Sequence, residues 1–314
     1  MTSSVCVIIL TYNEERHIQR AIESVAPIAS QIFVIDSYSS DGTVELALEC
    51  GATVLQNPFV NQAAQFQWAL DHAPIRSNWV LRLDADEIIE ADLQREISTR
   101  LPGLPPDVVG VNFKRKHIFM GRWVRHGGRY PLVMLRLWRH GHGRVENRWM
   151  DEHVLVWGGR TVTFDGGFAD HNLNDLSFFT DKHNKYATRE AIEILNQRLQ
   201  LFARDTELSA GGSSFQASFK RWIKEHVYNR IPFTVSAPAY FFWRYVCQLG
   251  FLDGRSGLVY HALQGLWYRF LVGAKVMEYE SAIHHLNDKR EMLAELSRLT
   301  GHRLLSETEQ KPAA

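Results

Sequence analysis

Three acids, Asp84, Asp86 and Glu87, lie together where the apolar run Trp79–Asp84 ends. The run is typical of a buried strand, and alternate residues of an extended chain point to the same side. The carboxylates of Asp84 and Asp86 can therefore approach one hard cation. Such a cation binds one or two carboxylates and completes its shell with phosphate oxygens and water. An isolated Asp-x-Asp pair more often faces solvent, but its position at a strand end favours a site.

Polar residues also follow two other apolar runs. Val5–Leu10 leads into a Thr-Tyr-Asn-Glu-Glu segment, and Gln31–Asp36 ends in an acid followed by a serine-rich turn. An acid at the end of the second strand of a β-α-β unit is well placed to hold ribose hydroxyls or a base edge, so Asp36 is a candidate ligand contact. Asp41 is better explained as a helix N-cap. Neither GxxxxGK[ST] nor GxGxxG occurs, which argues against a P-loop and a dinucleotide fingerprint.

A sheet must bring these strand ends together. Strands are predicted at 5–10, 31–36, 52–55 and 79–84, and helices at 15–25, 41–50, 61–72 and 91–101. Strands that are apolar throughout and alternate with helices indicate a parallel sheet covered on both faces. Ligands bind such sheets beyond the carboxyl ends of the strands. The predicted fold class is therefore α/β, with a Rossmann-like nucleotide-binding sheet and a helical, aromatic-rich C-terminal extension.

The segment Leu101–Asp107 is the clearest break in the chain. Beyond it, strands are predicted at 108–113, 133–138 and 153–157, and helices at 175–201 and 274–305. An Ala-Gly-Gly-Ser-Ser sequence at 210–214 is the best candidate linker. We predict one domain over 1–209, with a nucleotide-binding half at 1–107 and an acceptor half at 108–209, and a helical region over 210–314.

Charge is distributed unevenly in a chain whose net charge is zero. Of 314 residues, 35 are Lys or Arg and 35 are Asp or Glu, yet residues 112–148 hold ten basic residues and one acid. Aromatic residues interrupt this basic segment, so it is not a simple polar tail. A solvated basic face is the alternative, but the composition favours a surface for a phosphate or diphosphate. No nucleic-acid partner is expected.

Aromatic residues gather in the last third of the chain, where 215–279 hold 16 of the 36 Phe, Trp and Tyr. Basic residues are scattered among them, and no run of 18 apolar residues occurs. This composition favours a segment that lies on an anionic membrane surface, with an ordinary helical core as the alternative. The three cysteines are far apart and match no metal spacing, so a reduced compartment is expected. We expect a cytoplasmic protein bound peripherally to the inner face of the cell membrane.

Four motifs in order carry a family resemblance: VIILTYNEE (7–15), VIDSYSSDGT (34–43), QAAQFQWAL (62–70) and LRLDADE (81–87). Together they resemble the family-2 glycosyltransferases of the GT-A fold. Later features resemble the bacterial lipopolysaccharide-core and polysaccharide β-glycosyltransferases within that family. These are MDEHV at 150–154, the Gly-Gly pair before a His at 166–171, Lys182 with Tyr186, and FLDG at 251–254.

The resemblance implies an enzyme that transfers a sugar with inversion, using Mg²⁺ or Mn²⁺. The donor would be a nucleotide-sugar, with a UDP-sugar expected, and the acceptor a hydroxyl of a lipid-linked, lipopolysaccharide or polysaccharide glycan. It assigns the nucleoside to Thr11, Tyr12, Glu14 and Asp36, the metal and diphosphate to Asp84 and Asp86, and a further metal or diphosphate contact to His171. Asp86 would be the more direct ligand. Gln65 and Gln67 stand where relatives often have Lys or Arg and Asn, which leaves the donor sugar open.

Inversion by direct displacement needs a base that takes the proton of the acceptor hydroxyl. Asp151 and Glu152 are the only adjacent acids in the basic, aromatic stretch. The resemblance favours Glu152, and Asp151 stays open. The leaving diphosphate also needs cations, and Arg125, Arg129 and Arg136 are the candidates.

Two other functions fit the same architecture. A sugar-nucleotide nucleotidyltransferase would carry a glycine-rich loop after the first strand, where this chain has Thr-Tyr-Asn-Glu-Glu. A non-catalytic glycan-binding protein would not need Asp84, Asp86 and Glu152. The absence of a Gln-x-x-Arg-Trp motif argues against a processive polymerase.

Overall fold

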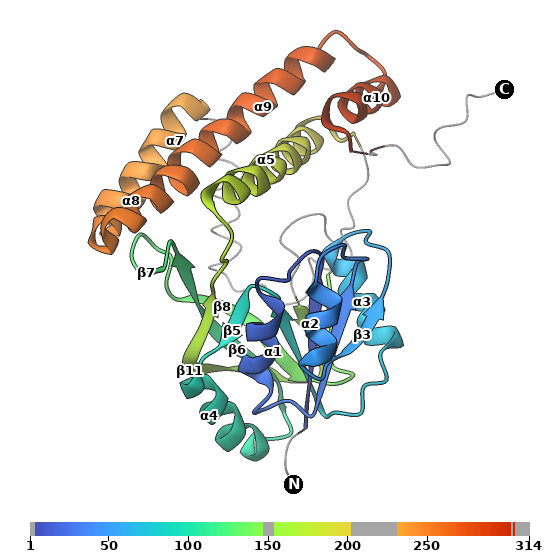
Figure 1. Cartoon of the computed structure of the whole chain (residues 1–314). Coiled ribbons are helices and arrows are strands. Elements are labelled where there is room, and N and C mark those ends of the chain that lie inside the picture. Colours follow the sequence, from blue (N-terminus) through green and yellow to red (C-terminus); the bar gives the residue numbers. More distant parts are fainter. Residues whose placement is uncertain (1–3, 147–153, 202–230, 303, 305–314) are drawn as a thin grey trace, which may run out of the picture. The chain divides into compact units, whose positions relative to one another are not determined.

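The computed structural model describes residues 4–146, 154–201, 231–302 and 304 (Figure 1). The chain forms two compact units. The first consists of Met1–Asn174 with Gln248–Leu258, and the second of Asp175–Cys247 with Val259–Ala314. The first unit contains the sheets and the second is helical.

A mixed sheet forms the centre of the first unit. Its strand order is β3 (Thr53–Gln56), β2 (Gln31–Asp36), β1 (Val5–Thr11), β4 (Trp79–Asp84), β8 (Leu132–Arg139), β6 (Val108–Phe119), β11 (Arg160–Asp170) and β5 (Glu87–Ile89). Strands β3, β2, β1 and β4 are parallel, whereas β8 runs antiparallel to both β4 and β6. The short β7 (Arg122–Val124) pairs with β6, and β9 (Gly143–Val145) with β10 (Val154–Val156). The α/β prediction is confirmed, but only the N-terminal half of the sheet is purely parallel.

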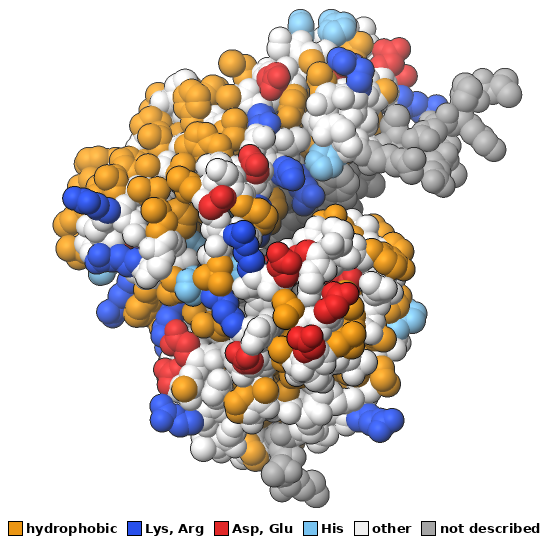
Figure 2. Space-filling view, viewed as in Figure 1, with side chains coloured by type: hydrophobic (Ala, Val, Ile, Leu, Met, Phe, Trp, Pro, Cys, Tyr) orange, Lys and Arg blue, Asp and Glu red, His pale blue; other side chains and the backbone are white. Residues whose placement is uncertain are grey.

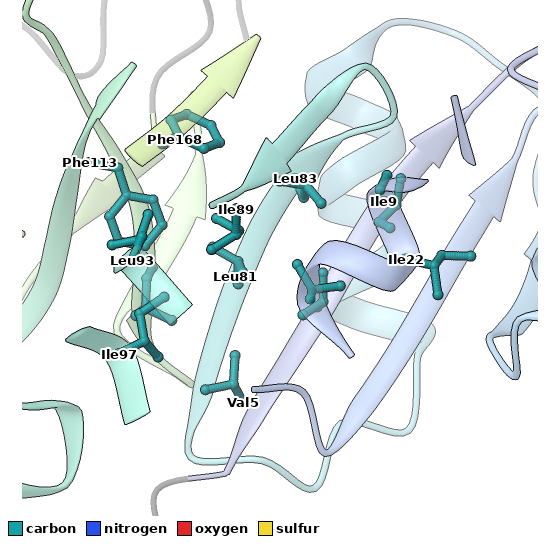
Figure 3. Packing of buried hydrophobic residues seen from close by; sticks show 14 of the residues in the cluster. Val5, Ile9, Ile22, Leu81, Leu83, Ile89, Leu93, Ile97, Phe113 and Phe168 are labelled. Carbon is teal, nitrogen blue, oxygen red and sulfur yellow. The ribbon is translucent and has the colours of Figure 1, made fainter. Parts of the chain in front are cut away.

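Apolar residues cover both faces of the parallel strands, because successive side chains of a strand point to opposite sides. Val5, Val7 and Ile9 share a buried cluster with residues of α1 (Ile18–Val25), α2 (Thr43–Glu49) and α4 (Ala91–Arg100) (Figure 3). Cys6 and Ile8 belong to a second cluster, with α3 (Gln62–His72). The predicted apolar face of the first helix is confirmed, since Ile18, Ile22 and Val25 are all buried.

The glycine pair before His171 lies in β11, where α4 approaches the strand too closely for a side chain. A Cβ atom on Gly166 would lie 2.4 Å from the Cα atom of Leu93. The Glu96 carboxylate accepts the N–H groups of Asp165 and Gly166, both at 2.8 Å. Packing of the helix on the strand therefore accounts for these glycines without a ligand.

The second unit contains α5 (Leu176–Leu199), α7 (Phe233–Phe242), α9 (Tyr268–Ile283) and α10 (Lys289–Thr300), while α8 (Gly254–His261) spans the point where the two units meet in sequence. Ala191 and Leu195 of α5 pack with Val276 and Tyr279 of α9. Among the described helices, none is long and apolar enough to cross a bilayer.

One C-terminal feature differs from the sequence expectation. The helix predicted at 274–305 is two helices, because α9 ends at Ile283 and the Asp288 side chain caps α10 by accepting the N–H of Arg290. The helix α5 belongs to the second unit, and the domain boundary near residue 209 stays a prediction. The predicted linker itself lies outside the described residues.

A buried ion cluster joins three strands of the mixed sheet. Arg136 of β8 donates from Nη2 to Asp84 Oδ2 of β4 at 3.0 Å and to Glu87 Oε1 of β5 at 2.5 Å. The side chains of Arg136 and Glu87 are 3% and 1% exposed. Glu87 also accepts the backbone N–H of Asp84 at 2.9 Å, which closes the turn between β4 and β5.

Replacing Arg136 with Met should lower the free energy of unfolding by about 3–5 kcal/mol, because Asp84 loses its closest cation and the buried Glu87 loses its hydrogen-bond donor. The control is Arg160→Met, which removes a salt bridge to Asp107 whose side chains are 57% and 59% exposed. We expect that control to cost at most about 1 kcal/mol. Urea denaturation measures both values, and equal losses would show that the buried cluster does not stabilise the sheet.

Candidate active site

The predicted site residues of strands β1, β2 and β4 meet at one edge of the sheet. Parallel pairing sets Thr11 of β1 beside Asp36 of β2, and Leu10 beside Asp84 of β4. The carboxyl ends of β1, β2 and β4 thus lie next to one another. This is the edge at which open α/β sheets bind ligands.

Asp36 is fully buried and all its acceptor positions are used. Its Oδ1 atom accepts the hydroxyls of Thr11 at 3.0 Å and Ser39 at 2.5 Å. Its Oδ2 atom accepts the N–H of Ser39 at 2.9 Å and the amide of Gln56 at 3.2 Å. A carboxylate has about four acceptor positions. Asp36 and Thr11 therefore hold the turn after β2, and a direct nucleoside contact would require one of these donors to leave.

Two further predicted contacts differ in exposure. The Tyr12 side chain is 61% exposed and can stack against a flat ligand. Glu14 instead bonds through Oε2 to Nδ1 of His17 at 2.6 Å. The Nε2 atom of His17 accepts the N–H of Leu173 at 2.9 Å. Glu14 and His17 thus connect the loop after β1 to the segment after β11.

Gln65 is buried on α3 and its amide is engaged by the protein. The Nε2 group donates to Ser37 Oγ at 3.1 Å and to the carbonyl of Asn57 at 3.0 Å. The Oε1 atom accepts from Asn57 Nδ2 at 2.7 Å. In this arrangement Gln65 positions the segments that follow β2 and β3. It would therefore affect a nucleotide-sugar indirectly, through the position of those segments.

The two carboxylates of the Asp-Ala-Asp motif have different surroundings. Burial alone would raise the pKa of Asp84, but the guanidinium groups of Arg136, Arg82 and Arg115 outweigh it and hold that pKa well below its usual range. Burial, helped by the charge of Asp84, raises the pKa of Glu87 to about 8. Asp84 is therefore the permanently charged partner of Arg136.

Asp86 lies with residues from two other elements. Its Oδ2 atom accepts the Asn172 amide at 3.0 Å, and its carbonyl accepts the N–H of His171 at 2.9 Å. Arg20 of α1 donates to the carbonyl of His171, and its Nη1 lies 3.2 Å from Nδ1 of that ring. Asp86, His171, Asn172 and Arg20 thus form one polar group at the ends of β4 and β11, which is called the edge cluster below.

The edge cluster determines which nitrogen of His171 carries the proton. Burial, together with the nearby charge of Arg20, lowers the pKa of His171, so the ring is neutral near pH 7. A guanidinium only donates hydrogen bonds, so Nδ1 accepts from Arg20 and the proton is on Nε2. An N–H group at Nε2 can donate to a phosphate oxygen, whereas a metal would need a free lone pair there.

Within the described residues, no three or more His, Cys, Asp and Glu side chains are arranged to hold a metal ion. Asp86 nevertheless offers a partly exposed carboxylate at the sheet edge. Mg²⁺ commonly takes one or two carboxylates and completes its shell with substrate phosphates and water. The donor set therefore fits a cation that binds together with a diphosphate.

Many charges of the basic segment are used inside the first unit. Lys116 pairs with Glu90 at 2.5 Å, Arg115 lies 3.6 Å from both Glu87 and Asp170, and Lys114 pairs with Asp165. Arg136 belongs to the buried ion cluster. The other two predicted diphosphate contacts, Arg125 and Arg129, lie in the loop between β7 and β8. Arg125 is exposed, and its guanidinium lies 5.3 Å from the Trp123 ring centroid.

The predicted base residues, Asp151 and Glu152, lie outside the described residues. Sequence reasoning also missed two members of the edge cluster. Asn172 directly follows His171 and could have been included with it. Arg20 stands on the polar side of an amphipathic helix, where nothing in the local pattern distinguishes it from a solvated arginine.

Comparison with known proteins gives three findings. The sequence model described as glycosyl transferase family 2 matches residues 6–169, more than half of the chain. An uncharacterized glycosyltransferase of Rickettsia bellii is 38% identical over 97 residues, which cover 31% of this chain and 32% of that protein. The glycosyltransferase SunS of Bacillus subtilis is 28% identical over 94 residues, 29% of this chain and 22% of that one.

Among solved structures, glucosyl-3-phosphoglycerate synthase from Mycobacterium tuberculosis is 21% identical, with a TM-score of 0.31, and the match covers 36% of this chain and 44% of that one. The matched stretch spans about a third of the length of the Rickettsia protein. The family model covers the whole mixed sheet up to the end of β11, in agreement with the four motifs found in the sequence. The chain belongs to glycosyl transferase family 2.

Proposed function

We propose that this chain is an inverting, metal-dependent glycosyltransferase that moves a sugar from a nucleotide-diphosphate donor to a glycan hydroxyl. The donor is a UDP-sugar, and the acceptor is a lipid-linked, lipopolysaccharide or polysaccharide glycan. The edge cluster is the observation that carries this proposal. It combines a carboxylate, a neutral imidazole with its proton on Nε2, and a half-buried guanidinium beside the carboxyl ends of β1 and β2.

The proposed donor site has two parts: the loop and turn after β1 and β2 bind the nucleoside, and the edge cluster binds the metal and the diphosphate. Tyr12 stacks against the base, and the turn held by Asp36 contacts the nucleoside. Asp86 holds Mg²⁺ or Mn²⁺, with Asp84 behind it, and His171 donates from Nε2 to the diphosphate. The bound metal would stabilise the charge that develops on the leaving diphosphate. Arg125 and Arg129 add positive charge that stabilises the leaving diphosphate.

Membrane association is a separate part of the proposal, supported by exposed apolar side chains of the second unit. Figure 2 shows hydrophobic side chains gathered over its helices. The exposed ones include Val235, Phe242, Trp243, Phe270 and Met277. Aromatic and aliphatic residues of this kind, interspersed with the basic residues of 215–279, suit the surface of an anionic bilayer.

Replacing Asp86 with Asn should reduce metal-dependent release of UDP from UDP-sugars by about a hundredfold or more, because the metal loses its carboxylate. A panel of UDP-sugars with Mn²⁺ provides the assay. The matched control is Asp71→Asn, an exposed acid on α3 that bonds only to Gln67 among the described residues. Equal activity of the two variants would contradict the metal role of Asp86. Nucleotidyl transfer, or binding without turnover by the wild-type protein, would favour the alternative functions.

Replacing Glu152 with Gln should reduce the rate of sugar transfer by about a hundredfold or more. The UDP affinity should stay unchanged, since a base acts in the chemical step. Asp151→Asn is the matched comparison. Transfer and UDP binding are measured on the same preparations. Loss of transfer only in Asp151→Asn would identify the other acid as the base, and full activity of both variants would exclude this pair.

Replacing Phe242 and Trp243 with Ser should release the full-length protein from vesicles that contain anionic lipid, because binding scales with the apolar area inserted. Point variants are preferable to a truncation, since Gln248–Leu258 belong to the first unit. Leu48→Ser is the control, because Leu48 is 55% exposed on α2 of the first unit. Sedimentation measures the bound fraction. If the wild-type protein never sediments with the vesicles, the membrane proposal is wrong.

A further inference from the structure

Two residues to which the proposed donor site gives no role, His126 and Asp253, meet in the first unit. His126 lies in the loop between β7 and β8, and Asp253 ends the short helix η4 (Gly250–Asp253) within the Phe-Leu-Asp-Gly motif. The Asp253 carboxylate accepts the backbone N–H of His126 at 2.8 Å and bonds to its Nδ1 atom at 2.7 Å. One carboxylate thus fixes both the backbone and the ring of a single histidine.

The surroundings hold Asp253 in place. The carbonyl of Gln248 accepts the N–H of Gly127 at 2.9 Å, and the carbonyl of Leu252 accepts from Arg122 at 3.4 Å. A Cβ atom on Gly257 would lie 2.5 Å from the Cβ atom of Asp253, so the following helix packs directly behind the acid. The Asp253 side chain is 4% exposed, whereas that of His126 is 35% exposed. A buried and fixed carboxylate therefore holds the ring of a histidine that is partly exposed.

The carboxylate also determines what the other ring nitrogen can do. Since it accepts the proton on Nδ1, the neutral ring carries its lone pair on Nε2. In the described part of the chain, the hydrogen bonds of His126 all go to Asp253. In the neutral ring the Nε2 atom is thus an oriented acceptor, which suits a hydroxyl donor.

Strand register places this loop at the edge that carries the donor site. Val124 of β7 pairs with His117 of β6, which in turn pairs with Asp170 at the end of β11. After the loop, β8 begins at Leu132 and runs antiparallel to β4, so its start points toward the carboxyl end of β4, where Arg136 bonds to Asp84. The loop therefore leaves the sheet on the side of Asp86 and His171.

The same loop contains aromatic rings suited to a sugar. Trp123 and Tyr130 flank it and meet edge to face, with ring centroids 4.9 Å apart. Both rings are partly exposed. Aromatic faces next to a hydrogen-bond acceptor are typical of carbohydrate recognition, because a sugar offers both apolar C–H faces and hydroxyl donors.

We propose that His126 is an acceptor-binding residue, whose Nε2 atom accepts a hydrogen bond from a hydroxyl of the acceptor sugar. Asp253 is its positioning residue. No proton is transferred, and the base of the reaction remains the carboxylate proposed above. This inference rests on the proposed function, because it assigns the acceptor side of the same site.

Two substitutions of His126 separate binding from structure. His126→Asn keeps an amide N–H near the position of Nδ1, so the bond to Asp253 can persist, but it has no atom at the position of Nε2. His126→Gln places an amide oxygen near the position of Nε2 and loses the bond to Asp253. A purely structural histidine would tolerate Asn better than Gln, and an acceptor-binding histidine the reverse.

The probes are the methyl glycosides of glucose, galactose and mannose, titrated into the full chain with UDP and Mg²⁺ present. We expect at least one of them to shift the ¹⁵N resonance of His126 Nε2. His126→Asn should weaken its binding by about tenfold, as for the loss of one hydrogen bond, with little change in Tm. His126→Gln should retain most of the affinity despite a lower Tm. His72→Asn, on the exposed end of α3, is the matched control and should bind as the wild type does.

The positioning role of Asp253 has its own readout. Asp253→Asn should remove the fixed Nδ1–H form of the ring from the ¹⁵N spectrum and weaken glycoside binding to a similar extent. Unchanged affinity in His126→Asn, or no glycoside that perturbs His126 in the wild type, would overturn the inference. The proposed function is judged separately by UDP release from the wild-type protein, so absence of turnover with intact glycoside binding would reject only that proposal.

Discussion

The buried guanidinium of Arg136 is the interaction on which the arrangement of the donor edge depends. It binds Asp84 and Glu87, so it joins β8 to β4, where the parallel half of the sheet meets the rest, and joins both to β5, the last strand in the sheet order. Burying charge is costly unless each ion finds a partner with good geometry. Because the cluster provides that geometry, the turn between β4 and β5 is fixed, and Asp86, which lies in that turn, faces the ends of β11 and α1.

This cluster changes the interpretation of the chain's charge. The basic segment is balanced by acids elsewhere in the chain, and the sequence alone suggested that this segment forms a surface for a phosphate or diphosphate. In the structure, Arg115, Lys116 and Arg136 pair with acids of the same unit. Much of the opposite charge therefore stabilises the sheet. Within the segment, we propose the loop with Arg125 and Arg129 as the part that meets an anionic ligand.

The sequence predicted those parts of the fold that depend on local pattern. The four parallel strands and their helices follow from uninterrupted apolar runs, and each lies within a few residues of its expected position. The sequence did not predict the strand β11, because a Gly-Gly pair interrupts its apolar pattern. The close packing of α4 on this strand explains the glycines. The helix expected at 274–305 contains a cap at Asp288 that the broad amphipathic pattern concealed. Contacts such as Arg20 with His171 join residues 151 positions apart and depend on the assembled sheet.

The central claim is that Asp86 holds a divalent cation only together with the donor diphosphate. Anomalous diffraction from crystals of the full chain grown with Mn²⁺, with and without UDP, tests it most directly. One Mn²⁺ peak in contact with the Asp86 carboxylate and the diphosphate is expected when UDP is present, and no peak there without it. A Mn²⁺ ion at Asp86 in the absence of UDP, or UDP bound with its diphosphate away from Asp86, would contradict the account.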